Sequence, residues 1–335
     1  MVKRILFFST YVIFCLACFL AIFEVIFRYQ LVDFYRPELR AFNRAADLGN
    51  SPRKTLMGMG DSLTAGWYTW LAYLRRQLPA YRVINGAISA TGIFEPLYTA
   101  PRRFREFHPQ VFIYQVFVGN DLQDIRRPLN WRTMTLPRYV YCFMCSYLRL
   151  HSLSFANYRL GQLLHNPGSG TTQITDPPFS SATYPKSVRI YTQAEPYNLE
   201  DTVLASGERA PDVVTLIAGI KKLCSYAGPD CRKYVVVIPD SAQVNDLYLD
   251  HLKQLGAQVR DPQALHQADY PLVIRLRKEL AVAGIKVLNP LPLFQGLEQL
   301  GQRLYYQNDP HLKPVGQTVL GQFVLQELKA DGLTS

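Results

Sequence analysis

The pattern of apolar and polar residues divides the chain into an apolar N-terminal segment, a polar connector and a long region of alternating elements. Residues 5–23 contain no charged residue, and after Glu24 the apolar run continues to Phe27. A helix rises about 1.5 Å per residue, so roughly 20 apolar residues cross a bilayer. We therefore expect residues 1–28 to form a membrane anchor and residues 29–53, which contain several Arg and two Pro, to form a juxtamembrane linker.

A cleaved leader is the alternative for the apolar segment. A signal peptide has a shorter apolar region and a cleavage site after small residues, whereas more apolar residues follow Ala17 and Cys18 here. The triplet that ends at Cys18 has some likeness to a lipoprotein cleavage site, but Cys15 stands where such a site usually has a large aliphatic residue. We therefore favour an uncleaved anchor. Positive residues flank the segment on both sides, so charge alone does not decide its orientation.

From residue 54 onwards, short apolar runs alternate with amphipathic segments. The clearest strand is expected at residues 111–118, and the remaining strands are expected at 55–59, 82–85, 234–238 and 285–288. Helices are expected at 67–78, 95–107, 211–228, 269–284 and 313–329. This alternation predicts an α/β domain with a parallel sheet covered on both faces, whose ligands bind beyond the carboxyl ends of the strands.

Residues 128–210 lack this alternation. They are rich in Pro, Ser, Thr and Tyr, and residues 166–170 carry a loop signal. We interpret them as an irregular insertion over the site, with a few short helices around residues 142–164. The domain is then expected to span residues 54–335, including this insertion.

The sequence Gly60-Asp61-Ser62 directly follows the first expected strand. Glycine lets the chain turn sharply, and a serine at this position stands at the edge of the sheet and at a helix N-terminus. Nearby N–H groups can stabilise negative charge there, which suits a nucleophile. Taken alone, the tripeptide is equally compatible with a turn in which Ser62 caps a helix.

Two further polar motifs lie beyond later strands. Asn120 follows the third expected strand, where its amide can donate to an oxyanion or simply form an Asx turn. Asp309 and His311 lie between the last expected strand and the last helix. Histidine is the usual general base at neutral pH, and a carboxylate can fix its tautomer. The alternative is that Asp309 caps the helix and His311 is merely exposed.

In combination and in this order, the three motifs resemble those of the SGNH hydrolases, also called GDSL esterases and lipases. The resemblance covers residues 54–335 apart from the insertion, and it implies a flavodoxin-like three-layer α/β/α sandwich. It further implies that Ser62 is the nucleophile and an oxyanion donor through its backbone N–H. By the same resemblance His311 is the general base, Asp309 is its orienting acid, and Asn120 is the side-chain oxyanion donor.

One position departs from the family pattern. The family has an oxyanion-hole glycine shortly after the second strand, and the best register places Ala90 there. An alanine keeps the backbone N–H, so the donor is retained if the local backbone conformation suits alanine. Gly86 and Gly92 are the candidates in other registers.

The balance of charge narrows the range of partners. Lys and Arg exceed Asp and Glu by 36 to 26, a net charge of +10, which favours contact with anionic material. No long Lys/Arg run or basic–aromatic module is present, so no nucleic-acid partner is expected. Four arginines follow the Asn120 motif and either attract an anionic polymer or lipid headgroup to the site or form a solvated surface: Arg126, Arg127, Arg132 and Arg138.

The cysteines outside the apolar segment form two close pairs, Cys142/Cys145 and Cys224/Cys231. A zinc site needs about four ligands and no second pair lies near the first, so no metal is expected. Both pairs suit disulfides in an oxidising compartment, and free thiols are the alternative. The pairs therefore favour a domain on the periplasmic or extracytoplasmic side of the membrane.

Together these features predict an anchored serine hydrolase that needs no cofactor. We expect it to cleave or transfer O-acyl esters, acetyl above all, on cell-envelope carbohydrate. A lipid-directed esterase or lysophospholipase is the first alternative, and an inactive anchored glycan-binding scaffold is the second. The sequence leaves the acyl length, the acceptor and the oligomeric state open.

Overall fold

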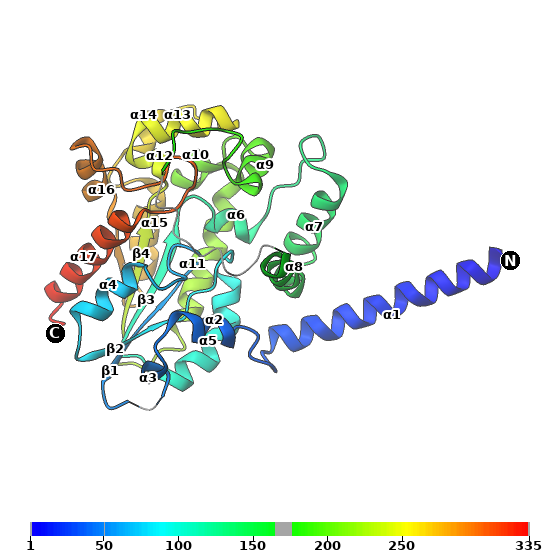
Figure 1. Cartoon of the computed structure of the whole chain (residues 1–335), viewed down its shortest axis with the longest axis horizontal. Helices are drawn as coiled ribbons and strands as arrows, with labels where there is room; N and C mark the ends of the chain where they lie inside the picture. Colours follow the sequence, from blue (N-terminus) through cyan, green and yellow to red (C-terminus); the bar gives the residue numbers. More distant parts are fainter. Residues whose placement is uncertain (1, 50, 165–175, 334–335) are drawn as a thin grey trace.

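A parallel five-stranded sheet forms the centre of the molecule (Figure 1). The computed structural model describes residues 2–49, 51–164 and 176–333. The strands are β1 (Lys54–Met59), β2 (Tyr81–Asn85), β3 (Val111–Phe117), β4 (Arg232–Ile238) and β5 (Ile285–Leu288), in the order β2-β1-β3-β4-β5. All neighbouring strands pair in parallel. The predicted α/β class with a parallel sheet is confirmed.

Helices cover both faces of this sheet, because each connection between parallel strands must cross over it. Helices α4 (Trp70–Gln77) and α17 (Pro314–Ala330) pack together on one face. On the other face, α11 (Ala210–Cys224) packs against both α5 (Phe94–Phe107) and α15 (Pro271–Ala281). Every residue of β2 and β3 is buried, which explains the mainly apolar sequence of β3, in which Gln115 is the one polar residue.

Several short helices were not predicted. The connector after the N-terminal helix contains α2 (Arg36–Phe42) and α3 (Ala45–Leu48), and the region after β4 contains α12 (Ser241–Val244), α13 (Asp246–Leu255) and α14 (Pro262–Leu265). Helix α16 (Leu291–Gln299) follows β5. Local capping signals were present: Asp240 caps α12 in a capping box, and Asn245 caps α13. Most of these helices are too short to show a helical period.

The region expected to be irregular is largely helical. It contains α7 (Leu136–Ser146), α8 (His151–Leu164), α9 (Lys186–Ala194), α10 (Asn198–Val203) and the 3-10 turn η1 (Gly207–Arg209), and the short helix α6 (Asp121–Ile125) precedes it. The loop expected at residues 166–170 lies outside the described residues. In Figure 1, α7 and α8 lie on the side of the body from which the N-terminal helix projects.

The N-terminal helix α1 (Val2–Arg28) extends away from the body (Figure 1). Its segment Phe7–Arg28 has a mean hydropathy of 2.4 and is mostly exposed, so it is long and apolar enough to span a membrane or to serve as a signal sequence. Only the C-terminal end of the helix packs on the domain. There Phe27 is fully buried and clusters with Tyr35 and with Ile88, which lies in the loop after β2.

All six cysteines are free thiols in the structure, so neither expected pair forms a disulfide there. Cys142 and Cys145 are buried on the inner side of α7, and Cys224 and Cys231 are buried beneath the sheet domain's surface. Burial raises the pKa of Cys224 to about 12 and that of Cys231 to about 11, which keeps both as unreactive thiols.

Candidate active site

The structure brings together Ser62, His311 and Asp309, although Ser62 is far from the other two in sequence. The Oγ of Ser62 lies 2.7 Å from Nε2 of His311. The Nδ1 of His311 contacts a carboxylate oxygen of Asp309, which also accepts the backbone N–H of His311 at 2.8 Å. A hydroxyl, an imidazole and a carboxylate linked in this order form the hydrogen-bonded series used by serine hydrolases.

The turn that carries Ser62 is held by buried polar contacts. The side chain of Asp61 accepts the N–H of Leu63 at 2.9 Å, and Gln115 of β3 accepts the N–H of Asp61 at 3.0 Å. A Cβ atom on Gly60 would lie 2.4 Å from the Gln115 side-chain oxygen, so the turn has no room for a side chain there. This close approach explains the glycine before Asp61-Ser62.

The loop that carries His311 is fixed to the insertion. The side-chain oxygen of Asn308 accepts the N–H of Ser180 at 2.7 Å, and its amide donates to the carbonyl of Pro177 at 2.9 Å. Lys313 forms an ion pair with Asp176 at 2.5 Å. The segment before α9 therefore helps to position the imidazole.

Charge and burial act in opposite directions on the His311–Asp309 pair. Burial alone would lower the pKa of His311 and raise that of Asp309. The hydrogen bond and the opposite charges prevail, so the pKa of His311 lies above its ordinary 6.5 and that of Asp309 below its ordinary 3.8. Asp61 lies behind the serine, where complete burial raises its own pKa to about 6.

Ala90 and Asn120, the other expected oxyanion donors, line the same cavity as Ser62 and His311, whereas Gly86 and Gly92 do not line it. Ala90 adopts a φ of 58°, in the left-handed region that favours glycine. An L-residue pays roughly 1–2 kcal/mol for this conformation. The backbone thus keeps at Ala90 the conformation that suits a glycine.

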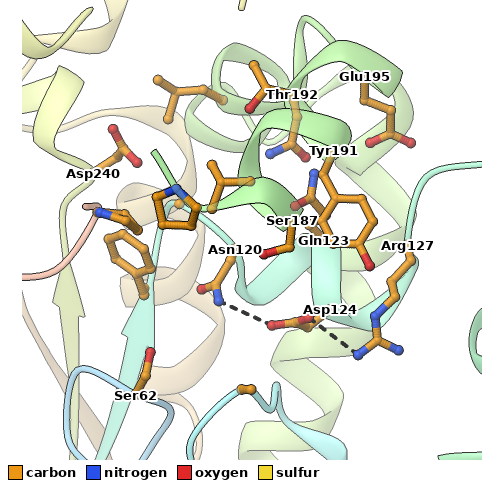
Figure 2. Close-up of a pocket in the computed structure, with 18 of the residues that line it drawn as sticks. Ser62, Asn120, Gln123, Asp124, Arg127, Ser187, Tyr191, Thr192, Glu195 and Asp240 are labelled. Atoms are coloured by element: carbon orange, nitrogen blue, oxygen red, sulfur yellow. Dashed lines mark hydrogen bonds and ion pairs between the residues drawn. The ribbon is translucent and has the colours of Figure 1, made fainter. Parts of the chain in front are cut away.

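A carboxylate that the sequence did not single out orients Asn120. The Nδ2 of Asn120 donates to Asp124 at 3.2 Å, and Asp124 lies 3.6 Å from the guanidinium of Arg127 (Figure 2). Burial raises the pKa of Asp124, while Arg127 acts to lower it. The Oδ1 of Asn120 is buried without a hydrogen-bond partner in the described part of the chain. The available signal was the spacing of four residues on α6, which places both side chains on one helix face.

The cavity beside Ser62 has a volume of about 420 Å³, and the insertion supplies much of its wall. Its lining combines hydroxyl, amide and phenol groups with apolar side chains. The polar residues include Gln123, Tyr141, Asn157, Tyr158, Ser187 and Tyr191, and the apolar residues include Phe117, Val188, Leu199 and Leu252.

The four arginines after Asn120 divide between the cavity and the surface. Arg127 and Arg138 line the cavity, so two of them face the site. Arg126 instead pairs with Asp212 at 3.2 Å, and Arg132 lies over the exposed ring of Trp131.

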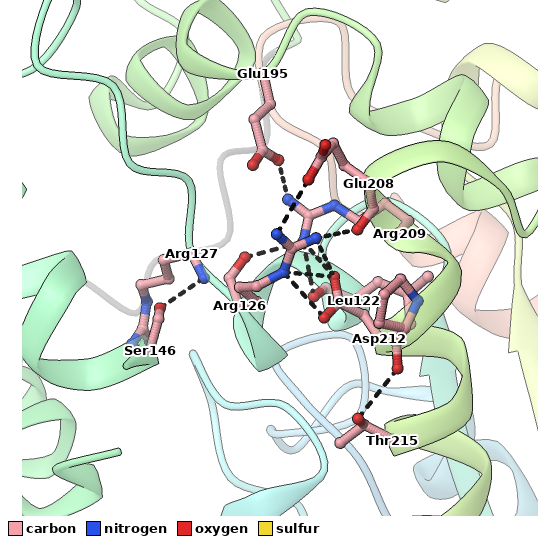
Figure 3. A network of polar contacts seen from close by, with 10 residues as sticks. Leu122, Arg126, Arg127, Ser146, Glu195, Glu208, Arg209, Asp212 and Thr215 are labelled. Atoms are coloured by element: carbon pink, nitrogen blue, oxygen red, sulfur yellow. Dashed lines mark hydrogen bonds and ion pairs between the residues drawn. The ribbon is translucent and has the colours of Figure 1, made fainter. Parts of the chain in front are cut away.

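A buried ionic network braces the cavity wall (Figure 3). The side chain of Arg209 is completely buried and donates to the carbonyl of Leu122 at 3.1 Å and to Asp212 at 3.0 Å. It also contacts the carboxylate of Glu195, a residue that lines the cavity. Arg209 thereby joins three parts of the fold: α6, α11 and the segment that follows α9.

Among the described residues, no group of three or more His, Cys, Asp or Glu is placed to hold a metal ion.

Comparison with known proteins gives distant structural matches. No protein-family model and no curated protein matches the chain. Similar solved structures include TesA, with 14% identity over 83% of this chain and 99% of that chain, at a TM-score of 0.40. A lipase/acylhydrolase from Enterococcus faecalis matches with 13% identity over 83% of this chain and 96% of that chain, at a TM-score of 0.41. Axe2, an acetylxylan esterase from Geobacillus stearothermophilus, matches with 14% identity over 86% of this chain and 97% of that chain, at a TM-score of 0.40. At these values the likeness says nothing about activity, which must be judged from this chain's own side chains.

Proposed function

We propose that this chain is a membrane-anchored serine esterase of the SGNH type that removes or transfers O-acyl groups. The observation that carries the proposal is the hydrogen-bonded series from Ser62 through His311 to Asp309 at the carboxyl edge of a parallel sheet. If Ser62 only capped a helix and His311 were merely exposed, the fold would not require Oγ of Ser62 and Nε2 of His311 to lie 2.7 Å apart.

In this mechanism His311 takes the proton of Ser62 as the serine oxygen attacks the ester carbonyl. The new C–O bond makes a tetrahedral oxyanion, and His311 then gives its proton to the leaving alcohol as the old ester bond breaks. Water, or a sugar hydroxyl in a transferase, resolves the acyl-enzyme by the same proton transfers. Asp309 stabilises the imidazolium in both halves of the reaction.

The oxyanion is assigned three donors: the N–H groups of Ser62 and Ala90 and the side-chain amide of Asn120. Their common position around one cavity supports this assignment. One hydrogen of the Asn120 amide is directed to Asp124, which leaves the second hydrogen for the oxyanion. Preorganised donors of this kind supply a large part of the rate enhancement in acyl transfer.

The lining of the cavity favours a carbohydrate ester over a long acyl chain. Tyrosine rings offer flat faces to a sugar, and the neighbouring amides and hydroxyls match its hydroxyl groups. Apolar side chains also line the cavity, among them Phe117, Val188 and Leu199, and can contact a short acyl group, but a long acyl chain would leave the amides and hydroxyls unpaired. We therefore propose an O-acetylated or similarly short-acylated envelope carbohydrate as substrate.

In the proposed domain organisation, residues 1–28 form the anchor, residues 29–53 the connector and residues 54–335 the catalytic domain. The extracytoplasmic location of this domain stays a prediction.

Turnover of p-nitrophenyl esters by the full chain in detergent tests the proposal. We expect hydrolysis of the acetyl ester, little hydrolysis of the octanoyl ester, and covalent labelling by a serine-reactive phosphonate. Ser62→Ala should abolish both turnover and labelling. Ser225→Ala, an exposed serine at the end of α11, is the matched control and should change neither.

Each other outcome has a definite meaning. Preference for the octanoyl ester would favour the lipid-directed alternative. A folded chain that neither turns over esters nor reacts with the phosphonate would favour the scaffold alternative and refute the esterase.

A further inference from the structure

Helices α7 and α8 expose apolar stripes. On α7, Leu136, Val140, Phe143 and Tyr147 are exposed and follow helical spacing along one face. The opposite side of this helix carries Tyr141, which lines the cavity.

Helix α8 repeats this arrangement. Leu160 and Leu163 are 54% and 80% exposed, while Ser154, Asn157 and Tyr158 line the cavity from another side of the helix. The two helices pack against each other. Together they form a layer with a polar inner face and an apolar outer face.

This layer is joined to the end of α1. The carboxylate of Glu24 accepts the backbone N–H groups of His151 and Ser152, the first two residues of α8, at 3.1 and 2.9 Å. A carboxylate at a helix N-terminus is stabilised by the helix dipole and by these free donors. The ring of Phe27 packs against Phe155 of α8, with ring centroids 5.6 Å apart. The apolar stripes are therefore held beside the point where α1 leaves the domain (Figure 1).

The chemistry around the stripes matches the boundary of a lipid bilayer. Aromatic residues with an apolar body and a polar tip are exposed next to these elements in the chain: Tyr29 directly follows α1, and Trp131 precedes α7. Such residues are enriched at membrane–water interfaces. Exposed Arg132 and Arg149 flank α7 and can contact anionic headgroups.

We propose that the outer faces of α7 and α8 rest on the lipid bilayer beside α1 and form a second membrane contact. This inference depends on the proposed anchoring by α1 and not on the esterase chemistry. Because the inner faces of the same two helices line the cavity, the near wall of the cavity would lie about one helix diameter, roughly 10 Å, from the lipid. Such a site suits acylated molecules held at the membrane surface.

Quenching of tryptophan fluorescence by brominated acyl chains tests the contact in the full chain. Three variants each add one probe to the native tryptophans: Leu160→Trp on α8, Phe14→Trp in α1, and Leu300→Trp at the end of α16. Leu300 is 84% exposed, and α16 lies on the opposite side of the body from α1 (Figure 1). All are reconstituted in nanodiscs of phosphatidylcholine and phosphatidylglycerol with and without bromine.

We expect the added emission of Leu160→Trp and Phe14→Trp to fall at least twofold in brominated nanodiscs, and that of Leu300→Trp to stay unchanged. Quenching at Phe14 alone would overturn the second contact while leaving the anchor intact. No quenching at either position would overturn both. If the Leu160→Trp emission is blue-shifted but unquenched and changes with protein concentration, a second copy of the chain covers the outer face of α8 and the lipid contact is overturned. Leu163→Trp serves if the Leu160 variant does not fold.

Discussion

The contact between Asn120 and Asp124 leads to a specific prediction about catalysis. If Asn120 donates to the oxyanion, Asn120→Ala removes one of three donors. Loss of one such donor costs about 10²–10³ in kcat, or about 2.7–4 kcal/mol of transition-state stabilisation. The substrate is bound by the rest of the cavity, so KM should change little.

Asp124→Ala should have a smaller effect, because it leaves the amide in place and removes only its orientation. The 3.2 Å hydrogen bond is partly buried and its acceptor is a carboxylate, so a net contribution of about 1–1.5 kcal/mol is expected, which corresponds to roughly a tenfold loss in kcat. The double variant should be no slower than Asn120→Ala, since Asp124 acts through an amide that is already absent. The expected coupling energy is therefore about 1 kcal/mol or more.

The assay is steady-state hydrolysis of the acetyl ester, with thermal unfolding measured in parallel. Asp124→Asn is the control, because its amide oxygen can still accept from Asn120, and it should retain most activity. Strictly additive losses in the double variant would show that Asp124 does not act through Asn120. Near-normal turnover in Asn120→Ala would refute the oxyanion assignment itself.

The remaining predictions concern pH and stability. His311 must be neutral to accept the serine proton and its pKa lies above 6.5, so kcat/KM should fall as pH decreases through a value above 6.5. Asp309→Asn removes the charge that raises this pKa, so its acid limb should move to lower pH while the maximum rate falls; an unmoved limb would contradict the pairing. Arg209→Ala should lower the free energy of unfolding by about 1.5–3 kcal/mol, because it removes a completely buried guanidinium that bonds to Asp212, Glu195 and the carbonyl of Leu122, although Arg126 still pairs with Asp212. Lys253→Ala, which removes an ion pair with Asp250 whose side chains are 44% and 66% exposed, should cost less than about 1 kcal/mol in the same denaturant titration, and equal losses would contradict the role of burial.

The sheet was predictable because its strands are buried on both faces. Residues 111–117 are apolar except for Gln115 and rich in β-branched and aromatic residues, a composition typical of a strand in a covered parallel sheet. The meeting of Ser62 with His311 was predictable for a related reason. Both residues lie in loops beyond the carboxyl ends of parallel strands, and loops distant in sequence come together at that edge of the sheet.

The insertion was not predictable by the same reasoning. Helix α7 buries Cys142 and Cys145 on one side and exposes Phe143 and Val140 on the other, so it shows no clean division into apolar and polar faces. A helix that contacts protein on one side and lipid on the other would have this composition. The role of Asp124 was also hidden, since it depends on Arg127 and Asn120 meeting inside a cavity that the insertion closes.

Glu24 shows how one residue connects the anchor to the rest of the fold. In the sequence it interrupts an apolar run, and a lone carboxylate in hydrocarbon is costly unless it is paired. In the structure it is buried and accepts N–H groups from the start of α8. In the proposed anchoring, the lipid-embedded part of α1 would end before Glu24, and residues 5–23 would supply roughly 28 Å of helix, close to the thickness of a bilayer core. This boundary would place the start of α8 at the level of the headgroups, where an amphipathic helix lying along the surface is stable.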